Sequence, residues 1–458
     1  MVTPRTRRSI PADADARTSS RDNWWLVGAA GLLIFMAQLD TTIVHVALPT
    51  IETDLGTRTA VTQWVVLGYL IPLVGLTLLS GRWLDTAGRR VALLAGAGGF
   101  AVTSVAAGLA PHIAWLVAAR LGQGVFAAVL LALAPVLAVQ SVRPEARGKA
   151  LAVVGALAPL GAMSGPVLGG LLLDTIGWPW VFFATAPPAV IAMLVGRWKL
   201  PRAGGLHLPQ LRWMSEVGLL GGAAVAVLLS LSLAADRHLG WLLLAVAAPP
   251  LLLAWRRSTV STPVRRLLEL PGMAGPHLAL LTAYLALLAV QFLAPFYLTR
   301  QLGVSAVATG TTLIALPAAT ALAGLASGVA SDRVGLRPVA IAGAAIGTLG
   351  LALLMPLAAS WTPLELAWRL AVLGAGFGLF VTPNMAMAMS IAPTERHGLT
   401  AATTNLARML GLSLGPAVAT VAWAVSGYTL AGMRAGLAVA LSAGAATVAL
   451  VALARAPQ

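Results

Sequence analysis

One carboxylate lies in the middle of an otherwise apolar run. The stretch MAQLDTTIVHVALP, residues 36–49, surrounds Asp40 with hydrophobic side chains, and His45 follows five residues later. A buried charge is costly unless it is paired or neutralised by a proton. Asp40 is therefore a candidate group for binding and releasing a proton. His45 is either a second titrating group or a neutral hydrogen-bonding residue.

Arg120, in the stretch ARLGQGVFAA, is the candidate partner of Asp40. An unpaired arginine inside a membrane helix costs at least about 2.5 kcal/mol, so a partner is expected. A rise of about 1.5 Å per residue places Asp40 about 14 Å and Arg120 about 10 Å below the same outer side of the membrane. The similar depths predict an ion pair in which Arg120 tunes proton binding by Asp40. The alternative is an ion pair that is purely structural.

Membrane-spanning helices must position these two residues. The 458-residue chain is 59% hydrophobic and only 10% charged, whereas soluble proteins carry about 25% charged residues. Apolar segments long enough to cross a bilayer recur along its whole length, which indicates an all-α polytopic membrane protein. We predict 14 transmembrane helices, at residues 24–49, 60–81, 91–110, 113–140, 150–173, 178–196, 216–235, 239–255, 276–299, 305–330, 337–357, 363–391, 399–424 and 430–454.

The composition excludes several kinds of chemistry. Cysteine is absent and the six histidines are scattered, so neither thiol chemistry nor a metal site is expected. The motif G-x-x-x-x-G-K-[ST] does not occur, which argues against an ATP-driven pump. The net charge of +15 is interpreted as membrane topology and not as nucleic-acid binding.

The positive charges predict the orientation of the chain. With the N-terminus in the cytoplasm, only four Arg residues fall outside and three fall within spans, and the remaining Lys and Arg lie on the inner side. The even number of spans then places both termini in the cytoplasm. Residues 1–23 are expected to form a disordered cytoplasmic tail, not a cleaved signal peptide. The expected location is the inner (cytoplasmic) membrane of a bacterium.

Among the 15 acidic residues, only Asp40 is predicted to lie deep in a span. Glu365 lies near the outer mouth of its span. It precedes Arg369 by four residues, a spacing at which an ion pair is geometrically natural.

The sequence contains an internal repeat. SGRWLDTAGRRVALLAGA begins at Ser80, and SGVASDRVGLRPVAIAGA begins 247 positions later, at Ser327. Further pairs recur at offsets of 249 and 250, among them Arg120 with Arg369 and Gly161 with Gly411. The repeat predicts two pseudo-symmetric six-helix bundles, at residues 24–200 and 271–458, with a linker and an inserted two-helix hairpin at 201–270. Two parallel halves around a central site suit alternating access.

Taken together, these motifs resemble the major facilitator superfamily, in its fourteen-helix drug:proton antiporter branch. The resemblance covers essentially every span. It implies a monomeric antiporter that exports amphipathic or cationic small molecules, such as drugs or antibiotics, by rocker-switch alternating access. A proton gradient would supply the energy and no cofactor would be needed. Besides the substrate, the expected partners are protons and the lipid bilayer, and no nucleic acid.

Two alternatives remain open from the sequence. An exporter of a single metabolite, such as an antibiotic or a siderophore, would share every motif. The second alternative, from a different functional class, is a membrane sensor or a membrane-embedded enzyme. The internal repeat and the shortness of the inner loops argue against it.

The resemblance also implies roles for residues in two motifs. The loop GRWLDTAGRR and its second copy would latch the two halves on the inner side, although Thr86 stands where the family usually has Arg. The stretch GAMSGPVLGG would form a hinge, because glycines four residues apart make a smooth ridge for a neighbouring helix and proline favours a bend. The latch residues are Gly81, Asp85, Gly88, Arg89, Arg90, Asp332, Arg333 and Arg337, and the hinge residues are Gly161, Gly165, Pro166, Gly169 and Gly170.

The candidates for contact with substrate come from four spans. Instead of contacting substrate, Trp64 could serve as an aromatic anchor at the membrane interface, and Tyr69 could be a packed core residue. The six candidates are Asp40, His45, Trp64, Tyr69, Gln123 and Gln291.

Overall fold

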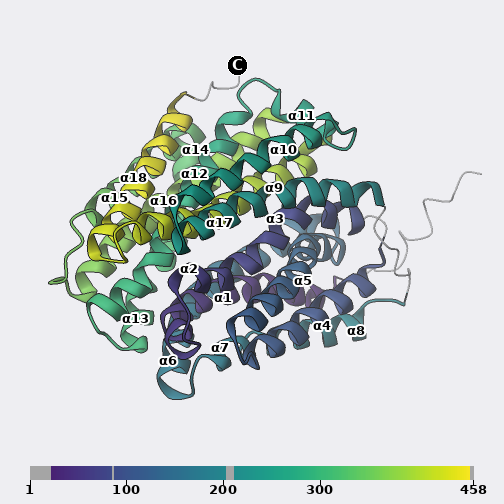
Figure 1. The fold of residues 1–458 in the computed structure, drawn as a ribbon. Helices are drawn as coiled ribbons and strands as arrows, with labels where there is room; N and C mark the ends of the chain where they lie inside the picture. Colours follow the sequence, from purple (N-terminus) through teal and green to yellow (C-terminus); the bar gives the residue numbers. More distant parts are fainter. Residues whose placement is uncertain (1–21, 85–86, 203–210, 454–458) are drawn as a thin grey trace, which may run out of the picture.

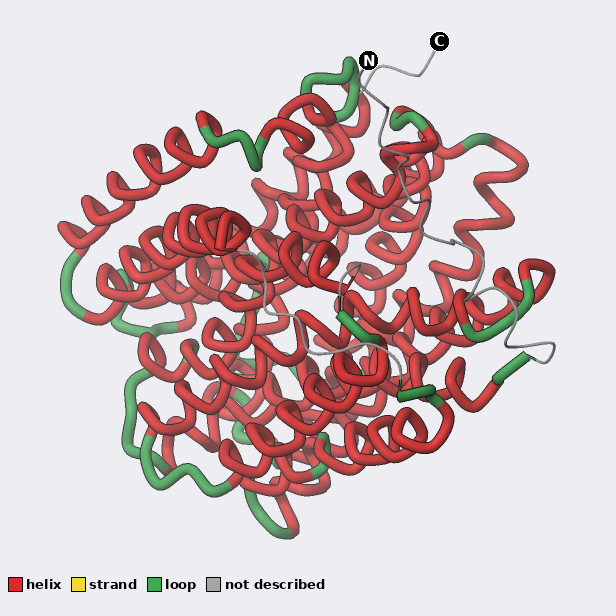
Figure 2. Tube along the Cα trace, turned by 90° about the vertical axis from the view of Figure 1, so that its right-hand side faces the viewer, coloured by secondary structure: helices red, strands yellow, loops and turns green. Residues whose placement is uncertain are grey.

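The protein is a bundle of helices that cross its full depth (Figure 2). The computed structural model describes residues 22–84, 87–202 and 211–453, and in these ranges 14 helical segments are long and apolar enough to span a membrane. This number and the all-helical architecture confirm the prediction. The helices are α1 (Trp24–Asp54), α2 (Thr59–Thr62), α3 (Trp64–Leu84), α4 (Arg89–Gly108), α5 (Ile113–Gln140), η1 (Pro144–Ala146), α6 (Arg147–Thr175), α7 (Pro179–Phe183), α8 (Ala186–Lys199), α9 (Leu211–Asp236), η2 (Leu239–Ala247), α10 (Ala248–Arg257), α11 (Thr262–Leu268), α12 (Ala274–Phe296), η3 (Tyr297–Gln301), α13 (Ala306–Leu313), α14 (Ala315–Val334), α15 (Leu336–Leu354), α16 (Pro363–Ile391), η4 (Thr394–Arg396), α17 (His397–Ala424) and α18 (Leu430–Leu453).

Several spans differ locally from the expected continuous α-helices, and the eighth and the first are two examples. The eighth begins as the 3₁₀ helix η2 and becomes α-helical only at Ala248. The first continues through Pro49 to Asp54, beyond its expected end. Proline removes one donor from a helix, but α1 packs extensively against its neighbours, and this packing stabilises the extra turn.

Helix pairing repeats between the two parts of the chain. In α1–α8, α1 packs on α6, α5 lies between α3 and α4, and α4 also contacts α8. In α12–α18, α12 packs on α17, α16 lies between α14 and α15, and α15 also contacts α18. The same arrangement of contacts therefore occurs twice. We call α1–α8 the first half and α12–α18 the second half.

The inserted helix α9 lies along the junction of the two halves. Figure 1 shows it between α3 of the first half and α17 of the second half, and it contacts both of these helices. Helix α10 packs on α9 and contributes few buried side chains.

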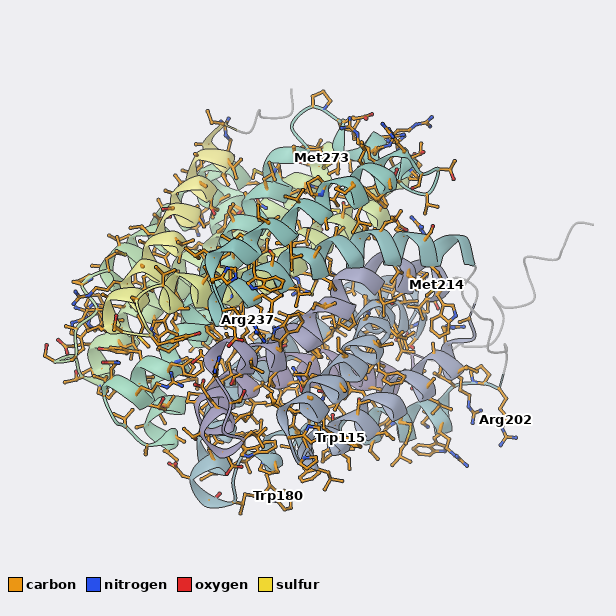
Figure 3. The ribbon with its side chains drawn as sticks, in the orientation of Figure 1. Trp115, Trp180, Arg202, Met214, Arg237 and Met273 are labelled. Carbon is orange, nitrogen blue, oxygen red and sulfur yellow. The ribbon has the colours of Figure 1, made fainter. Side chains whose placement is uncertain are left out.

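The two ends of the bundle are distinguished by the path of α1. We call the end at which α1 begins the near end and the end at which it finishes the far end. Trp115 and Trp180 lie at the far end, in the lower part of Figure 3, each 49% exposed. Trp25 and Trp198, at the near end, are 64% and 72% exposed. Tryptophan at both ends of an apolar bundle is typical of membrane–water interfaces.

Candidate transport site

Asp40 and Arg120 form a buried ion pair. Nη1 of Arg120 lies 2.9 Å from Oδ1 and 2.8 Å from Oδ2 of Asp40. The two residues are 0% and 1% exposed. The structure thus brings together the two residues that were expected to pair by depth. It does so because α5 packs against both α1 and α3.

Three further groups complete a polar network around this pair. Nε of Arg120 donates to the carbonyl oxygen of Val65 at 2.8 Å. Gln123 accepts from Arg120 and donates to Asp40 at 3.2 Å and to Ser104 at 2.7 Å. All of these groups belong to the first half. Both charges are compensated, which is the condition for stability in a membrane interior.

Tyr69 separates the ion pair from a central cavity. Its ring centroid lies 4.5 Å from Cζ of Arg120, a cation–π contact. Tyr69 also lines a cavity of about 450 Å³, between helices of the two halves. A cavity of this size can hold a drug-sized molecule. Asp40 and Gln123, both 0% exposed, lie behind this part of the wall.

The remaining substrate candidates occupy different places. Gln291 on α12 lines the central cavity. It also lines a smaller cavity together with His45, whose Nε2 is buried without a hydrogen-bond partner among the described residues. Trp64 lies at another interface, because its indole N–H donates to Ser232 of α9 at 2.6 Å. In this conformation, Trp64 thus connects α3 to the inserted helix, and its contact with substrate stays a prediction.

The glycine ridge of α6 packs against the helix that carries Asp40. A Cβ atom at Gly161 would collide with the carbonyl oxygen of Phe35, and one at Gly165 would collide with Thr42. At Gly169 the nearest atom would be Cγ1 of Ile43, at 3.1 Å. Close approach of α1 and α6 therefore requires these glycines.

The last residues of the same motif meet the second half. A Cβ atom at Gly170 would collide with the carbonyl oxygen of Ala306, and the carbonyl oxygen of Pro166 leaves no room for a Cβ at Gly310 of α13. The motif thus joins an interface within one half to an interface between the halves.

The far end is closed by polar contacts between the halves. Arg300 of η3 forms an ion pair with Glu52 of α1. Asp174 at the end of α6 accepts the backbone N–H groups of Ala306 and Val307 at 3.1 and 2.9 Å. These contacts join the two halves at the far end. The cavity extends from mid-depth toward the near end, where Gly155 and Gly324 contribute to its wall.

The residues of the expected latch contact their own halves. Nη1 of Arg90 donates to the carbonyl oxygen of Leu200 at 3.2 Å, and Arg337 donates to the carbonyl oxygen of Ala452. Each bond therefore ties the loop to the end of the sixth helix of the same half. The other members are distributed as follows: Asp332 and Arg333 are exposed, Gly88 and Arg89 are half-buried, Gly81 has open space around it, and Asp85 lies outside the described residues.

The side chain of Glu365 does not pair with Arg369. It accepts the backbone N–H of Thr362 at 2.6 Å in a capping box at the start of α16. Arg369 instead donates to the carbonyl oxygen of Glu365 and stacks on Trp361 at 4.0 Å. The N-terminal position of Glu365 explains this, because free backbone N–H groups compete for its carboxylate.

Sequence analysis did not single out two charged residues. One is Arg300, whose ion pair with Glu52 closes the far end. The other is Arg408, which the structure places in the lining of the central cavity. The position of Arg408 within a span was the available signal for it.

The fold and the cavity between two similar halves define a transporter. The chain belongs to the Major Facilitator Superfamily, whose family model matches residues 30–416 and 277–457. It is a transporter of the drug-efflux type and not an enzyme, and its fourteen apolar helices make it a multi-pass membrane protein.

Two curated relatives and one solved structure illustrate the similarity. The tetracenomycin C resistance and export protein of Streptomyces glaucescens is 30% identical over 404 residues, which cover 86% of this chain and 75% of the relative. The multidrug resistance protein Stp of Mycobacterium tuberculosis (strain CDC 1551 / Oshkosh) is 30% identical over 407 residues, which cover 85% of this chain and 74% of the relative. The inward-facing, occupied structure of a bacterial homologue of the human lysosomal transporter Spinster has the same fold, with a TM-score of 0.71, 14% identity and 95% and 97% of the two chains covered.

Proposed function

We propose that this chain exports amphipathic small molecules in exchange for protons. The observation that carries the proposal is the buried Asp40–Arg120 pair, which is separated from a drug-sized cavity by the ring of Tyr69. Protonation of Asp40 would remove one charge of the pair and weaken its hold on Arg120. Arg120 could then move relative to Tyr69 and change the cavity wall. The proton and substrate sites would in this way communicate through one stacked contact.

The contacts between the helices support alternating access. A closed far end and a cavity extending toward the near end correspond to one of the two states that such a transporter needs. We propose that residues 24–200 and 271–458 move as two bodies, with residues 201–270 as the inserted linker and hairpin. The α6 glycine motif would guide this movement, because it contacts both α1 and α13. The loop at residues 81–90 and its second copy would latch the near end in the opposite state.

We further propose that the protein is a monomer in the bacterial inner membrane with both termini in the cytoplasm. Most Lys and Arg residues that lie outside the spans then fall on the cytoplasmic side. The near end is the cytoplasmic end in this orientation, so the cavity accepts substrate from the cell interior. The energy comes from the proton gradient, without a cofactor.

The proposed function has two forms, multidrug export and export of a single metabolite, which differ in the range of substrates. Among the relatives, one is named for export of a single compound and another for multidrug resistance. The apolar lining of the cavity, with several neutral polar groups, favours a broad range of related compounds.

A growth-inhibition screen in a bacterial host that lacks its own efflux pumps tests the proposal. The panel contains anionic, neutral and cationic antibiotics, and wild-type protein is compared with Asp40→Asn at equal expression. Protection by the wild type and its loss in Asp40→Asn support proton-coupled export. Equal protection by both proteins contradicts a coupling role for Asp40. Several unrelated hits support multidrug export, and a single hit supports a narrow-range exporter.

A further inference from the structure

Arg408 of α17 is the charged side chain in the described lining of the central cavity. Neither an aspartate nor a glutamate contributes to that lining. The nearby carboxylate of Asp40 is fully buried and bonded to Arg120 behind Tyr69. A molecule inside the cavity therefore meets a surface with one positive charge and no compensating negative charge.

The structure holds Arg408 in place without neutralising it. Its Nε and Nη2 donate to Oδ1 of Asn405 at 3.1 and 2.7 Å, and its Cζ lies 5.9 Å from the ring centroid of Tyr284. Asn405 and Tyr284 are uncharged partners. Arg408 forms no ion pair with any described carboxylate, and its Nη1 makes no hydrogen bond to a described residue. A guanidinium group has five donors, so some of them remain available for a bound molecule.

An aromatic wall lies beside this charge. The rings of Tyr284 and Phe377 pack edge to face with centroids 4.8 Å apart, and both residues line the cavity. Met409 and Leu412 add apolar surface next to Arg408 in the same helix. The cavity thus offers a flat apolar surface and a positively charged hydrogen-bond donor within one site.

We propose that the cavity binds amphipathic organic anions, each with a planar aromatic body and a carboxylate. Arg408 binds the carboxylate through charge-assisted hydrogen bonds, and the aromatic body packs against Tyr284 and Phe377. An organic cation would meet an uncompensated like charge at Arg408. This inference rests on the proposed function, because it takes the central cavity as the transport site, and it narrows the substrate class from amphipathic or cationic molecules to anions.

The proposal has a consequence for coupling. An anionic substrate has no reason to compete with a proton for Asp40, since both carboxylates are negative. The exchange of proton and substrate would then depend on the stacked contact of Arg120 and Tyr69, and not on direct replacement at one carboxylate. The separation of Asp40 from the cavity by Tyr69 agrees with this indirect route.

Binding of three matched probes tests the assignment. The probes are 1-pyrenebutyrate, its neutral amide and the corresponding trimethylammonium derivative, which share one aromatic body. Affinities are measured by calorimetry on the full chain in nanodiscs of neutral lipid, with the heat of empty nanodiscs subtracted. The proteins are the wild type, Arg408→Gln, Arg408→Lys and Arg257→Gln, in which an exposed arginine of α10 is replaced as a control. Size-exclusion profiles confirm that each variant is folded.

We expect the wild type to bind pyrenebutyrate at least about 10-fold more tightly than the amide, and the cation most weakly. Arg408→Gln should lower the affinity for the anion by about 10- to 100-fold and leave the amide unchanged. Arg408→Lys should retain part of the preference, and Arg257→Gln all of it. Equal or tighter binding of the cation, binding of none of the probes, or equal loss for all three in Arg408→Gln would overturn the assignment. No pH gradient is present in this experiment, so a failure of proton coupling does not affect its result.

Discussion

The guanidinium group of Arg120 stacks on the ring of Tyr69, 4.5 Å from its centroid, while Tyr69 forms part of the cavity wall. The two residues therefore connect a buried charge network to the space that would hold substrate. The ion pair itself lies entirely in the first half, whereas the cavity is lined by both halves. The stacked contact therefore offers one route from Asp40 to the cavity that both halves line.

The Tyr69 ring is predicted to be necessary for coupling, whereas its hydroxyl is not. Tyr69→Phe keeps the stacked ring and should retain proton-driven transport near the wild-type rate. Tyr69→Leu removes the cation–π contact, worth about 0.5–2 kcal/mol, and should lower proton-driven transport at least about 10-fold. Counterflow of substrate in proteoliposomes without a pH gradient serves as the control and should persist in Tyr69→Leu. Equal rates of proton-driven transport in the Phe and Leu variants would show that the ring does not transmit the signal.

The Asp40–Arg120 pair should stabilise the fold as well as carry a proton. Removing one partner of a buried ion pair typically costs about 3–5 kcal/mol. Arg120→Ala should therefore lower the unfolding temperature strongly, because Asp40 keeps only its bond to Gln123. Asp40→Asn should lower it less, since Arg120 retains Val65 and Gln123 as acceptors.

A double variant distinguishes the stabilising contribution of the ion pair from the contributions of the two individual side chains. In Asp40→Asn with Arg120→Ala, neither buried charge remains, so the unfolding temperature should recover above that of Arg120→Ala alone. Thermal unfolding followed by tryptophan fluorescence in detergent gives the comparison. Additive losses from the two substitutions would mean that the two side chains act independently.

The depth of Asp40 and Arg120 could be predicted from sequence because helical rise is constant and both helices begin or end at recognisable boundaries. The glycine ridge was likewise readable from its four-residue spacing, although the sequence did not say that its partner is α1. The role of Tyr69 was not readable, since an aromatic residue in a span fits a packed core equally well. The pair of Glu52 and Arg300 joins positions 248 residues apart on different halves. Only the arrangement of the halves in one conformation brings them into contact.

Gly161 is predicted to tolerate no side chain. In Gly161→Ala, the new methyl group would overlap the carbonyl oxygen of Phe35, a backbone atom that cannot rotate away. Overpacking of this kind typically costs about 1–3 kcal/mol, so both the unfolding temperature and the transport rate should fall. Gly148→Ala in the first turn of the same helix is the matched control, because nothing lies within 4 Å of its Cβ position. Similar behaviour of the two variants would argue against tight packing of α6 on α1.

The contact between Glu52 and Arg300 is predicted to favour the state with a closed far end. Glu52→Gln removes the charge of a partly exposed pair, worth about 1 kcal/mol, which corresponds to about a fivefold change in the equilibrium. The chain has no cysteine, so a single Gly155→Cys in the cavity wall can report access from the near end. N-ethylmaleimide should label this cysteine more slowly when Glu52→Gln is also present. A Gly148→Cys control should be labelled equally in both backgrounds, and unchanged labelling at position 155 would refute a closing role for the pair.

Transport in proteoliposomes tests the central claim, that Asp40 carries the coupled proton, most directly. The substrate is the compound against which the wild type protects most strongly, and its movement is measured with and without an imposed pH gradient. The account predicts that the gradient drives accumulation by the wild type. Asp40→Asn should then show gradient-independent counterflow but no accumulation and no substrate-induced proton movement. Full gradient-driven accumulation by Asp40→Asn would contradict the account.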